Sequence, residues 1–271
     1  MNEDAFIVFD VGATKTRVAL ARGGSISDPV IYGTPQDPEE GIHALRTAAD
    51  TLLRGKEPTA ACGGVPGTVE RESLLVSARN LPPWGGVDLG LRLSQAWGIP
   101  TTILNDGELV ALGEYYFGAG KGERNMLYVT VSTGVGGAHI VDGRIDKGRY
   151  NAEIGHQVVN RGELEDSISG TAVQKRYGVH PKEISDPAIL NELADILAQG
   201  LYDNVLHWSP EVVVLGGSMI VGKNGIPVER VSETLSALVT QYYPAAPDVR
   251  KALLGDIGGL YGGLAYFMYR T

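Results

Sequence analysis

The chain has 271 residues, 43% of them hydrophobic and 20% charged, so its composition favours a folded protein over a disordered or fibrous one. Its 23 Lys and Arg against 32 Asp and Glu give a formal charge of −9, which repels a nucleic-acid backbone or an anionic membrane. Cys62 is the single cysteine, so we expect no internal disulfide. No apolar run is long enough to cross a bilayer, and the opening MNEDAFIVFD lacks the features of a signal peptide. We therefore expect a cytoplasmic protein with no nucleic-acid or membrane partner.

Two similar hairpins are the first strong pattern along the chain. Residues 6–12 form an apolar strand, residues 13–16 a turn and residues 17–21 a second strand. The pattern recurs at residues 128–134 and 139–144, which gives Gly12 and Gly134 equivalent places. Two copies of one supersecondary unit predict two similar α/β lobes.

The remaining elements alternate between helix and strand, which predicts a largely parallel sheet. The apolar spacing predicts helices at 38–53, 88–97, 107–117, 185–207, 228–242 and 258–268, and strands at 59–67, 100–105 and 211–215. We expect an N-terminal lobe at 1–107, joined by the last helix at 255–271, and a larger lobe at 108–254.

The turn of the first hairpin has the composition of a phosphate-binding loop. The residues concerned are Asp10, Gly12, Thr14, Lys15 and Thr16. Glycine and hydroxyl residues at a hairpin tip present donors that can surround phosphate oxygens, and a carboxylate at the strand end can hold a hydrated Mg²⁺. Taken alone, the segment is a moderate signal, and an ordinary Gly/Thr hairpin with an Asp at its edge remains the alternative.

Two further glycine clusters follow strands in the second half of the chain. They comprise Ser132, Thr133, Gly134 and Gly136 in one, and Gly216, Gly217 and Ser218 in the other. Glycine inside a strand usually marks a close backbone approach, and a glycine pair at the carboxyl end of a parallel strand is typical of a nucleotide site. A flexible turn remains the alternative for each cluster.

Together the three clusters resemble the phosphate 1, phosphate 2 and adenosine motifs of the actin/hexokinase/heat-shock-protein ATPase superfamily. An ordered series narrows the resemblance to the ROK family of bacterial sugar kinases and repressors: Gly64-Val-Pro-Gly67, Asn80-Leu-Pro-Pro-Trp84, Asn105-Asp106, Ala111-Leu-Gly-Glu114 and Glu153-Ile-Gly-His156. The resemblance implies an α/β fold of two duplicated ribonuclease H-like (actin-like ATPase) lobes around a central cleft. It also implies ATP-dependent phosphorylation of a hexose, with Mg²⁺ as cofactor, by a protein that is a homodimer.

Phosphoryl transfer to a sugar hydroxyl suggests specific roles for the polar residues of this series. A sugar hydroxyl is a poor nucleophile, so a carboxylate that accepts its proton assists phosphoryl transfer, and Asp106 is the candidate base. The same Asp106 could instead cap the helix that it begins. The resemblance assigns the sugar pocket to Gly64, Asn80, Asn105, Asp106, Glu153, His156 and Glu165.

One segment departs from the family pattern. Many ROK proteins follow Glu-x-Gly-His with three cysteines that bind structural zinc together with the histidine, whereas this chain has the shorter Gln157–Glu165 and none of those cysteines. Glu163 falls where the last cysteine would be. We therefore expect no structural zinc, because one histidine without thiolates does not make a tetrahedral site. We also expect His156 to be free for the sugar, and Glu165 to keep its sugar-binding place despite the shorter loop.

Three alternatives carry less weight. A ROK repressor needs a helix-turn-helix ahead of the first hairpin, which here begins by residue 6, and the charge of −9 also disfavours DNA. A catalytically weak sugar sensor has no need for Asp10, Asp106 and Ser132–Gly137 together. An actin-like filament protein has no need for the sugar-pocket residues.

Overall fold

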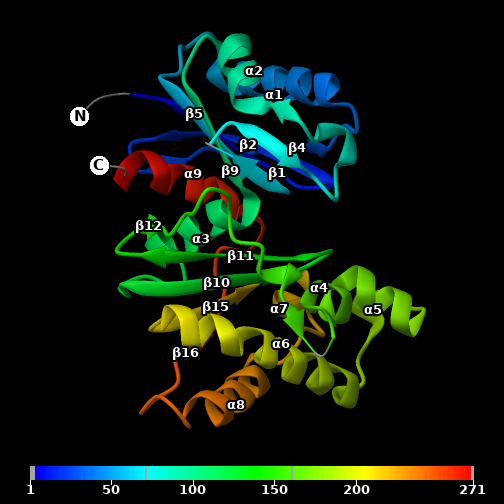
Figure 1. Cartoon of the computed structure of the whole chain (residues 1–271). Coiled ribbons are helices and arrows are strands. Elements are labelled where there is room, and N and C mark those ends of the chain that lie inside the picture. Colours follow the sequence, from blue (N-terminus) through cyan, green and yellow to red (C-terminus); the bar gives the residue numbers. More distant parts are fainter. Residues whose placement is uncertain (1–3, 71, 160, 270–271) are drawn as a thin grey trace. The chain divides into compact units, whose positions relative to one another are not determined.

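The structure of the chain is a computed structural model that describes residues 4–70, 72–159 and 161–269 (Figure 1). The chain divides into two compact units. Unit 1 comprises Met1–Gly113, Lys147–Asn151 and Asp256–Thr271, and unit 2 comprises Glu114–Asp146 and Ala152–Gly255. Within the described ranges, no helix combines the length and the apolar character that crossing a membrane requires.

Unit 1 is built on a mixed sheet with the strand order β3-β2-β1-β5-β9 and with β4 also paired to β2. The strand β1 pairs antiparallel with β2 and parallel with β5, and β5 pairs parallel with β9. The strands are β1 Phe6–Val11, β2 Lys15–Arg22, β3 Ser25–Ile26, β4 Val30–Gly33, β5 Ala60–Val65 and β9 Thr101–Asn105.

Helices cover both faces of this sheet. Figure 1 shows α1 (Pro38–Leu53) and α2 (Leu89–Trp97) on one face and α9 (Gly258–Tyr269) on the other. Alternate side chains of β1 serve the two faces, as the pleat of a strand requires: Phe9 packs in the core with Leu45 of α1, while Val8 lies against α9. Helix α1 begins where Asp37 accepts hydrogen bonds from two backbone N–H groups of its first turn.

A smaller sheet lies beside the edge strand β9 of unit 1. It has the order β6-β7-β8, from the strands β6 Thr68–Glu70, β7 Leu74–Ser77 and β8 Val87–Asp88. A short 3-10 helix, Pro82–Trp84, connects β7 to β8. The segment Lys147–Asn151 joins this sheet through a backbone bridge between Glu70 and Tyr150 and a hydrogen bond from the Val69 N–H to Asn151 Oδ1.

Unit 2 contains a sheet with the order β12-β11-β10-β15-β16. Its strands are β10 Asn125–Val131, β11 Val135–Val141, β12 Arg144–Ile145, β15 Val212–Gly216 and β16 Asp248–Lys251. Two short strands, β13 Val158–Val159 and β14 Gly162–Glu163, form a separate hairpin. The helices are α4 Leu164–Ile168, α5 Gly170–Tyr177, α6 Pro187–Trp208, α7 Ser218–Val221 and α8 Val228–Val239, with 3-10 turns at Ile154–His156, Pro181–Glu183 and Gly255–Ile257, the last extending into unit 1.

The core of unit 2 lies between its sheet and the helices α6 and α8 (Figure 1). Leu127, Val129 and Val131 of β10 are fully buried there, with Leu197 and Leu201 of α6. Helix α3 (Asp106–Phe117) begins in unit 1, and its residues from Glu114 onward belong to unit 2.

The duplication predicted from the two hairpins is confirmed by the sheet topology. In each unit an antiparallel hairpin is followed by two parallel strands: β2-β1-β5-β9 in unit 1 and β11-β10-β15-β16 in unit 2. One detail of the prediction is wrong. Val11 is the last paired residue before the first turn and Val131 before the second, so Gly12 corresponds to Ser132 rather than to Gly134.

The predicted helices all form, with shifts of a few residues at their ends. Helix α8 ends at Val239 rather than at residue 242. The sequence pattern did not predict the small sheet β6-β7-β8, the edge strand β16, or the short helices α4, α5 and α7. Short elements carry too few residues to display a periodicity.

Candidate functional site

The carboxyl ends of three neighbouring strands in unit 1 bring Asp10, Gly64 and Asp106 together. Asp10 of β1 is the register partner of Gly64 in β5. The Cα atom of Asp106, the residue after β9, lies 3.0 Å from the position that a Cβ would take on Gly64. Parallel strands that end at one edge of a sheet form the usual ligand site of α/β proteins.

Asp106 stands at the first turn of α3, and a reciprocal pair of caps fixes that turn. The Asn105 Oδ1 atom accepts hydrogen bonds from the N–H groups of Gly107, at 2.8 Å, and Glu108, at 3.3 Å. In return, the Glu108 carboxylate accepts the Asn105 N–H at 3.1 Å. This is the capping-box arrangement, and it holds Asp106 between its two members.

Lys147 supports the cap from a distant part of the sequence. Its Nζ atom lies 3.4 Å from Glu108 Oε2, and the Glu108 side chain is only 1% exposed. Burial raises the pKa of Glu108, and the nearby Lys147 ammonium opposes that rise. The spacing Asn105-x-x-Glu108 could have signalled the cap from the sequence, but nothing local indicated Lys147.

The electrostatic environment of Asp10 is unusual. Burial, followed by repulsion from Asp106 and a smaller repulsion from Asp256, raises the pKa of Asp10 to about 7, against the opposing attraction of Arg17. Helix α9 contributes to this burial because it passes Asp10 at Gly259, where an added Cβ would lie 2.8 Å from the carboxyl carbon of Asp10. Arg17 itself pairs with Asp256 at 2.9 Å. A divalent cation would relieve the repulsion between the carboxylates.

Thr34 holds the turn that follows Asp10 through two hydrogen bonds. The Thr34 hydroxyl donates to the Gly12 carbonyl at 2.7 Å, and the Thr34 N–H donates to the Thr14 carbonyl at 3.1 Å. Thr16 is buried, with its hydroxyl 2.9 Å from that of Thr34, whereas Lys15 is exposed. Of the predicted phosphate-binding side chains in this turn, the structure therefore exposes Lys15 and encloses Thr16.

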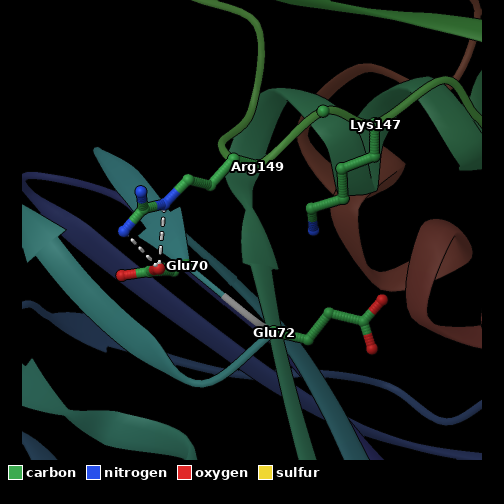
Figure 2. Close-up of a pocket in the computed structure, with 5 residues that line it drawn as sticks. Glu70, Glu72, Lys147 and Arg149 are labelled. Atoms are coloured by element: carbon green, nitrogen blue, oxygen red, sulfur yellow. Dashed lines mark hydrogen bonds and ion pairs between the residues drawn. The ribbon is translucent and has the colours of Figure 1, made fainter.

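A cavity of about 610 Å³ lies within unit 1, lined by Glu70, Glu72, Lys147, Gly148 and Arg149 (Figure 2). Figure 2 shows the Glu72 and Lys147 side chains directed into the same space, with Arg149 paired to Glu70 at one side of it. None of these residues was predicted from the sequence. Of the residues that were, Asn80 lies exposed in the turn after β7.

In unit 2 the second glycine turn is held mainly through its backbone. The Ser132 carbonyl accepts the Gly170 N–H at 2.7 Å, and the Thr133 carbonyl accepts the Thr171 hydroxyl at 2.9 Å. The Val135 N–H donates to Glu165 Oε2 at 2.7 Å. Glu165 therefore contacts the glycine turn directly, a contact that the sequence did not predict.

The third glycine cluster lies beside the second. Thr130 of β10 is the register partner of both Gly136 in β11 and Gly216 in β15. Gly217 and Ser218 follow Gly216 into the short helix α7, and the hydroxyl oxygens of Ser132 and Ser218 are 3.1 Å apart. The predicted nucleotide residues of unit 2 thus form one continuous group.

His156 stands at the end of a 3-10 turn that packs against the start of β11. Its Nδ1 atom lies 2.9 Å from Glu163 Oε2, and its Nε2 atom lies 3.8 Å from Glu153 Oε2. Glu163 therefore engages one of the two ring nitrogens of His156, and the sugar-binding role of His156 stays a prediction. Asn160, in the same segment, lies outside the described residues.

Comparison with known proteins identifies the family. The model of the ROK family matches residues 6–269, and the chain belongs to this family. It is similar to the glucokinase of Thermotoga maritima, with 29% identity over 78% of this chain and 80% of that protein.

Two solved structures extend the similarity to the fold. The ROK hexokinase from Thermus thermophilus gives a TM-score of 0.84 at 28% identity, over 97% of this chain and 98% of that one. The ROK family glucokinase from Streptomyces griseus, solved in complex with glucose and AMPPNP, gives a TM-score of 0.81 at 25% identity, over 96% of this chain and 98% of that one. The fold is therefore that of ROK sugar kinases, an actin-like ATPase fold.

Proposed function

We propose that this ROK protein is an ATP-dependent sugar kinase that transfers the γ-phosphoryl group of ATP to a hydroxyl of a hexose or hexose derivative. The observation that carries the proposal is that Asp10, at the end of β1, and Asp106, after β9, both lie against Gly64 of the intervening strand β5, where Asp106 also raises the pKa of Asp10. Phosphoryl transfer to an alcohol uses one carboxylate for the metal and another for the proton. The similarity to glucokinases supports the same activity.

Asp106 is the general base in this proposal. Its place in the first turn of α3, between Asn105 and Glu108 of the capping box, fixes the carboxylate relative to the ends of β5 and β9. A base must be held still to accept a proton from a bound hydroxyl. The proposed partners for the remaining hydroxyls of the sugar are Gly64, Asn80, Asn105, Glu153, His156 and Glu165.

The nucleotide contacts in this proposal belong to the glycine-rich turns. The proposed phosphate contacts are Gly12, Thr14, Lys15 and Thr16 from unit 1, and Ser132, Thr133, Gly134 and Gly136 from unit 2. Of these residues, Thr16 is buried, with its hydroxyl on that of Thr34. The adenosine lies near Gly216, Gly217 and Ser218.

Mg²⁺ fits the donors that unit 1 offers. Mg²⁺ in kinases binds one or two carboxylates and completes its shell with water and phosphate oxygens. Asp10, whose ionised form is disfavoured by burial and by Asp106, would gain a compensating positive charge. Asp10 would hold the ion through water, and the ion would neutralise charge on the transferring phosphate.

A homodimer and a cytoplasmic location complete the proposal, and both rest on the family resemblance and the sequence. Sedimentation or light scattering of the purified chain measures the first directly. The alternative of a catalytically weak sugar sensor is not favoured, because the relatives compared above are kinases by name.

A coupled assay of ADP release tests the proposal across glucose, fructose, mannose and N-acetylhexosamines. We expect Mg²⁺-dependent turnover that requires one of these sugars and exceeds the rate without sugar. ATP hydrolysis that is indifferent to every sugar would contradict a kinase. Sugar binding without any turnover would favour the sensor.

A further inference from the structure

The segment after His156 is where the family resemblance implies structural zinc, and the donors in this chain do not fit that ion. Zinc of this kind is bound by cysteine thiolates together with histidine. The single cysteine, Cys62, is buried in β5 of unit 1. Among the described residues, no group of three or more His, Cys, Asp or Glu side chains is arranged to hold a metal. Here a carboxylate, that of Glu163, occupies the Nδ1 side of His156.

Apolar packing holds this segment in the fold. Leu164 and Ile168 of α4 are fully buried in the core of unit 2. Leu164 fits against α6 at Gly200, where an added Cβ would meet its side chain at 2.7 Å. The β13–β14 hairpin, in which Val158 pairs with Glu163, brings the Glu163 carboxylate back to His156.

Glu163 also determines where the proton of His156 lies. A carboxylate only accepts hydrogen bonds, so the 2.9 Å contact requires that His156 Nδ1 carry a hydrogen and donate it. In the neutral ring the lone pair is then on Nε2, on the side of Glu153. The distance of 3.8 Å from Nε2 to Glu153 Oε2 is too long for a direct hydrogen bond. Nε2 is therefore available as an acceptor for a hydroxyl.

We propose that Glu163 is a positioning residue for His156: it fixes the ring and its tautomer so that Nε2 accepts a hydrogen bond from a hexose hydroxyl. The inference rests on the proposed function, because His156 meets a sugar only if the chain binds one. Removing the partner that orients a metal-binding histidine typically lowers metal affinity or activity by about 10- to 100-fold, and we expect an effect of that order on sugar binding here.

The exposure of the pair indicates orientation rather than support of the fold. The His156 side chain is 33% exposed and that of Glu163 is 35% exposed. Ion pairs with this much contact with water contribute little to stability. Loss of the Glu163 carboxylate should therefore change the ring of His156 and leave the fold, which rests on Leu164 and Ile168, in place.

The test combines NMR of the imidazole nitrogens with sugar kinetics in the full chain. The variants are Glu163→Ala, Glu163→Lys and Glu163→Gln, with the exposed Glu183→Gln as the charge-matched control and His156→Gln to assign the signals. In the wild type and in Glu163→Gln, whose amide oxygen still accepts, we expect the Nδ1–H tautomer. In Glu163→Ala and Glu163→Lys we expect a shift to the Nε2–H tautomer and a rise in KM for the preferred hexose of about 10-fold or more, with a smaller change in kcat.

Three outcomes would overturn the inference. One is a wild-type tautomer and KM in Glu163→Ala and Glu163→Lys. Another is loss of cooperative melting in both variants, since Glu163 would then support the fold. The third is an equal loss in Glu183→Gln. If the wild type phosphorylates no hexose, the proposed function fails, yet the tautomers of the wild type and Glu163→Ala still decide whether Glu163 orients His156.

Discussion

The hairpins β1–β2 and β10–β11 have the same topology and differ most at the residue two positions before the turn. In unit 1 this residue is Asp10, which has Arg17 as its register partner and is influenced by Asp106 and Asp256. In unit 2 it is Thr130, whose register partners are Gly136 and Gly216. The hairpin of unit 1 thus has charged side chains around the Asp10 carboxylate, whereas the hairpin of unit 2 has glycines beside Thr130.

The two turns are also stabilised differently. Thr34 fastens the first turn by bonding to Gly12 and Thr14. The second turn is fastened by α4 and α5, through Glu165, Gly170 and Thr171. The two turns of the duplicated scaffold are therefore held by different means: the first by one threonine, and the second by two helices.

Substitutions of the carboxylates at the strand ends of unit 1 should have the largest effect on the rate of the reaction. We expect Asp106→Asn to lower kcat by roughly 10²–10⁴-fold, because the amide keeps the shape but does not accept a proton. Steady-state kinetics with ADP detection measures this, and sugar binding should persist in calorimetry. The exposed Asp50→Asn on α1 is the control. A variant that keeps most of its turnover would show that the base lies elsewhere.

Unit 2 also contains a buried carboxylate, that of Glu114, and it accepts hydrogen bonds from backbone N–H groups. Glu114 accepts hydrogen bonds from the N–H groups of Ala119, Leu253 and Leu254. We expect Glu114→Ala to lower the free energy of unfolding by about 3 kcal/mol, since these buried donors would lose their acceptor. Denaturant melts measure the change, with Glu183→Ala as the control. An unchanged midpoint would contradict a structural role.

Asp10 should make stability depend on pH. Because its pKa is raised from 3.8 to about 7 in the folded chain, folding binds a proton between those values. Its contribution to stability is fully present below pH 3.8 and is lost as pH rises through about 7. We expect Asp10→Asn to be about 4 kcal/mol more stable than the wild type at pH 8 and nearly equal to it at pH 4.

Urea melts at several pH values measure this difference, and a difference that does not vary with pH would contradict it. Mg·ATP binding should release a proton near pH 7, because the cation favours the ionised carboxylate of Asp10. Calorimetry in buffers of different ionisation enthalpy detects the released proton. Asp256→Asn should reduce the shift only slightly, because Asp256 is the weakest of its named causes.

If the two glycine turns serve one reaction, sugar and nucleotide should bind cooperatively. We expect the preferred hexose to tighten binding of a non-hydrolysable ATP analogue by about 1–3 kcal/mol, and the analogue to tighten sugar binding by the same amount. Calorimetry with and without the second ligand measures both directions. An actin-like ATPase would bind nucleotide indifferently to sugar, and a sensor would not bind nucleotide at all.

The smallest expected effect concerns zinc. We expect less than a tenth of a zinc ion per purified chain by elemental analysis, because the segment after His156 offers a carboxylate in place of thiolates. Treatment with a zinc-selective chelator should leave the melting temperature and the Mg²⁺-supported activity unchanged. One zinc per chain would overturn both this prediction and the proposed role of Glu163.

The sequence by itself determined the order of the elements, the duplication of the hairpin and the position of Asp106 directly after a strand. These features depend on apolar periodicity, on glycine and on spacing over fewer than about 20 residues, which a single chain displays locally. For that reason α1 was predicted with its observed bounds, Pro38–Leu53. The Asn105 and Glu108 cap, three residues apart, lay within the same range.

The tertiary structure alone decided which groups meet at the site. Asp256 reaches Arg17 across 239 residues, and Lys147 reaches Glu108 across 39. His156 and Glu163 are closer in sequence, but they meet only because a hairpin returns the chain and Leu164 anchors it on Gly200. The pKa of Asp10 follows from burial by a helix at the other end of the chain and from charges on three separate segments. Such properties depend on distances through space, and no local pattern of residues encodes them.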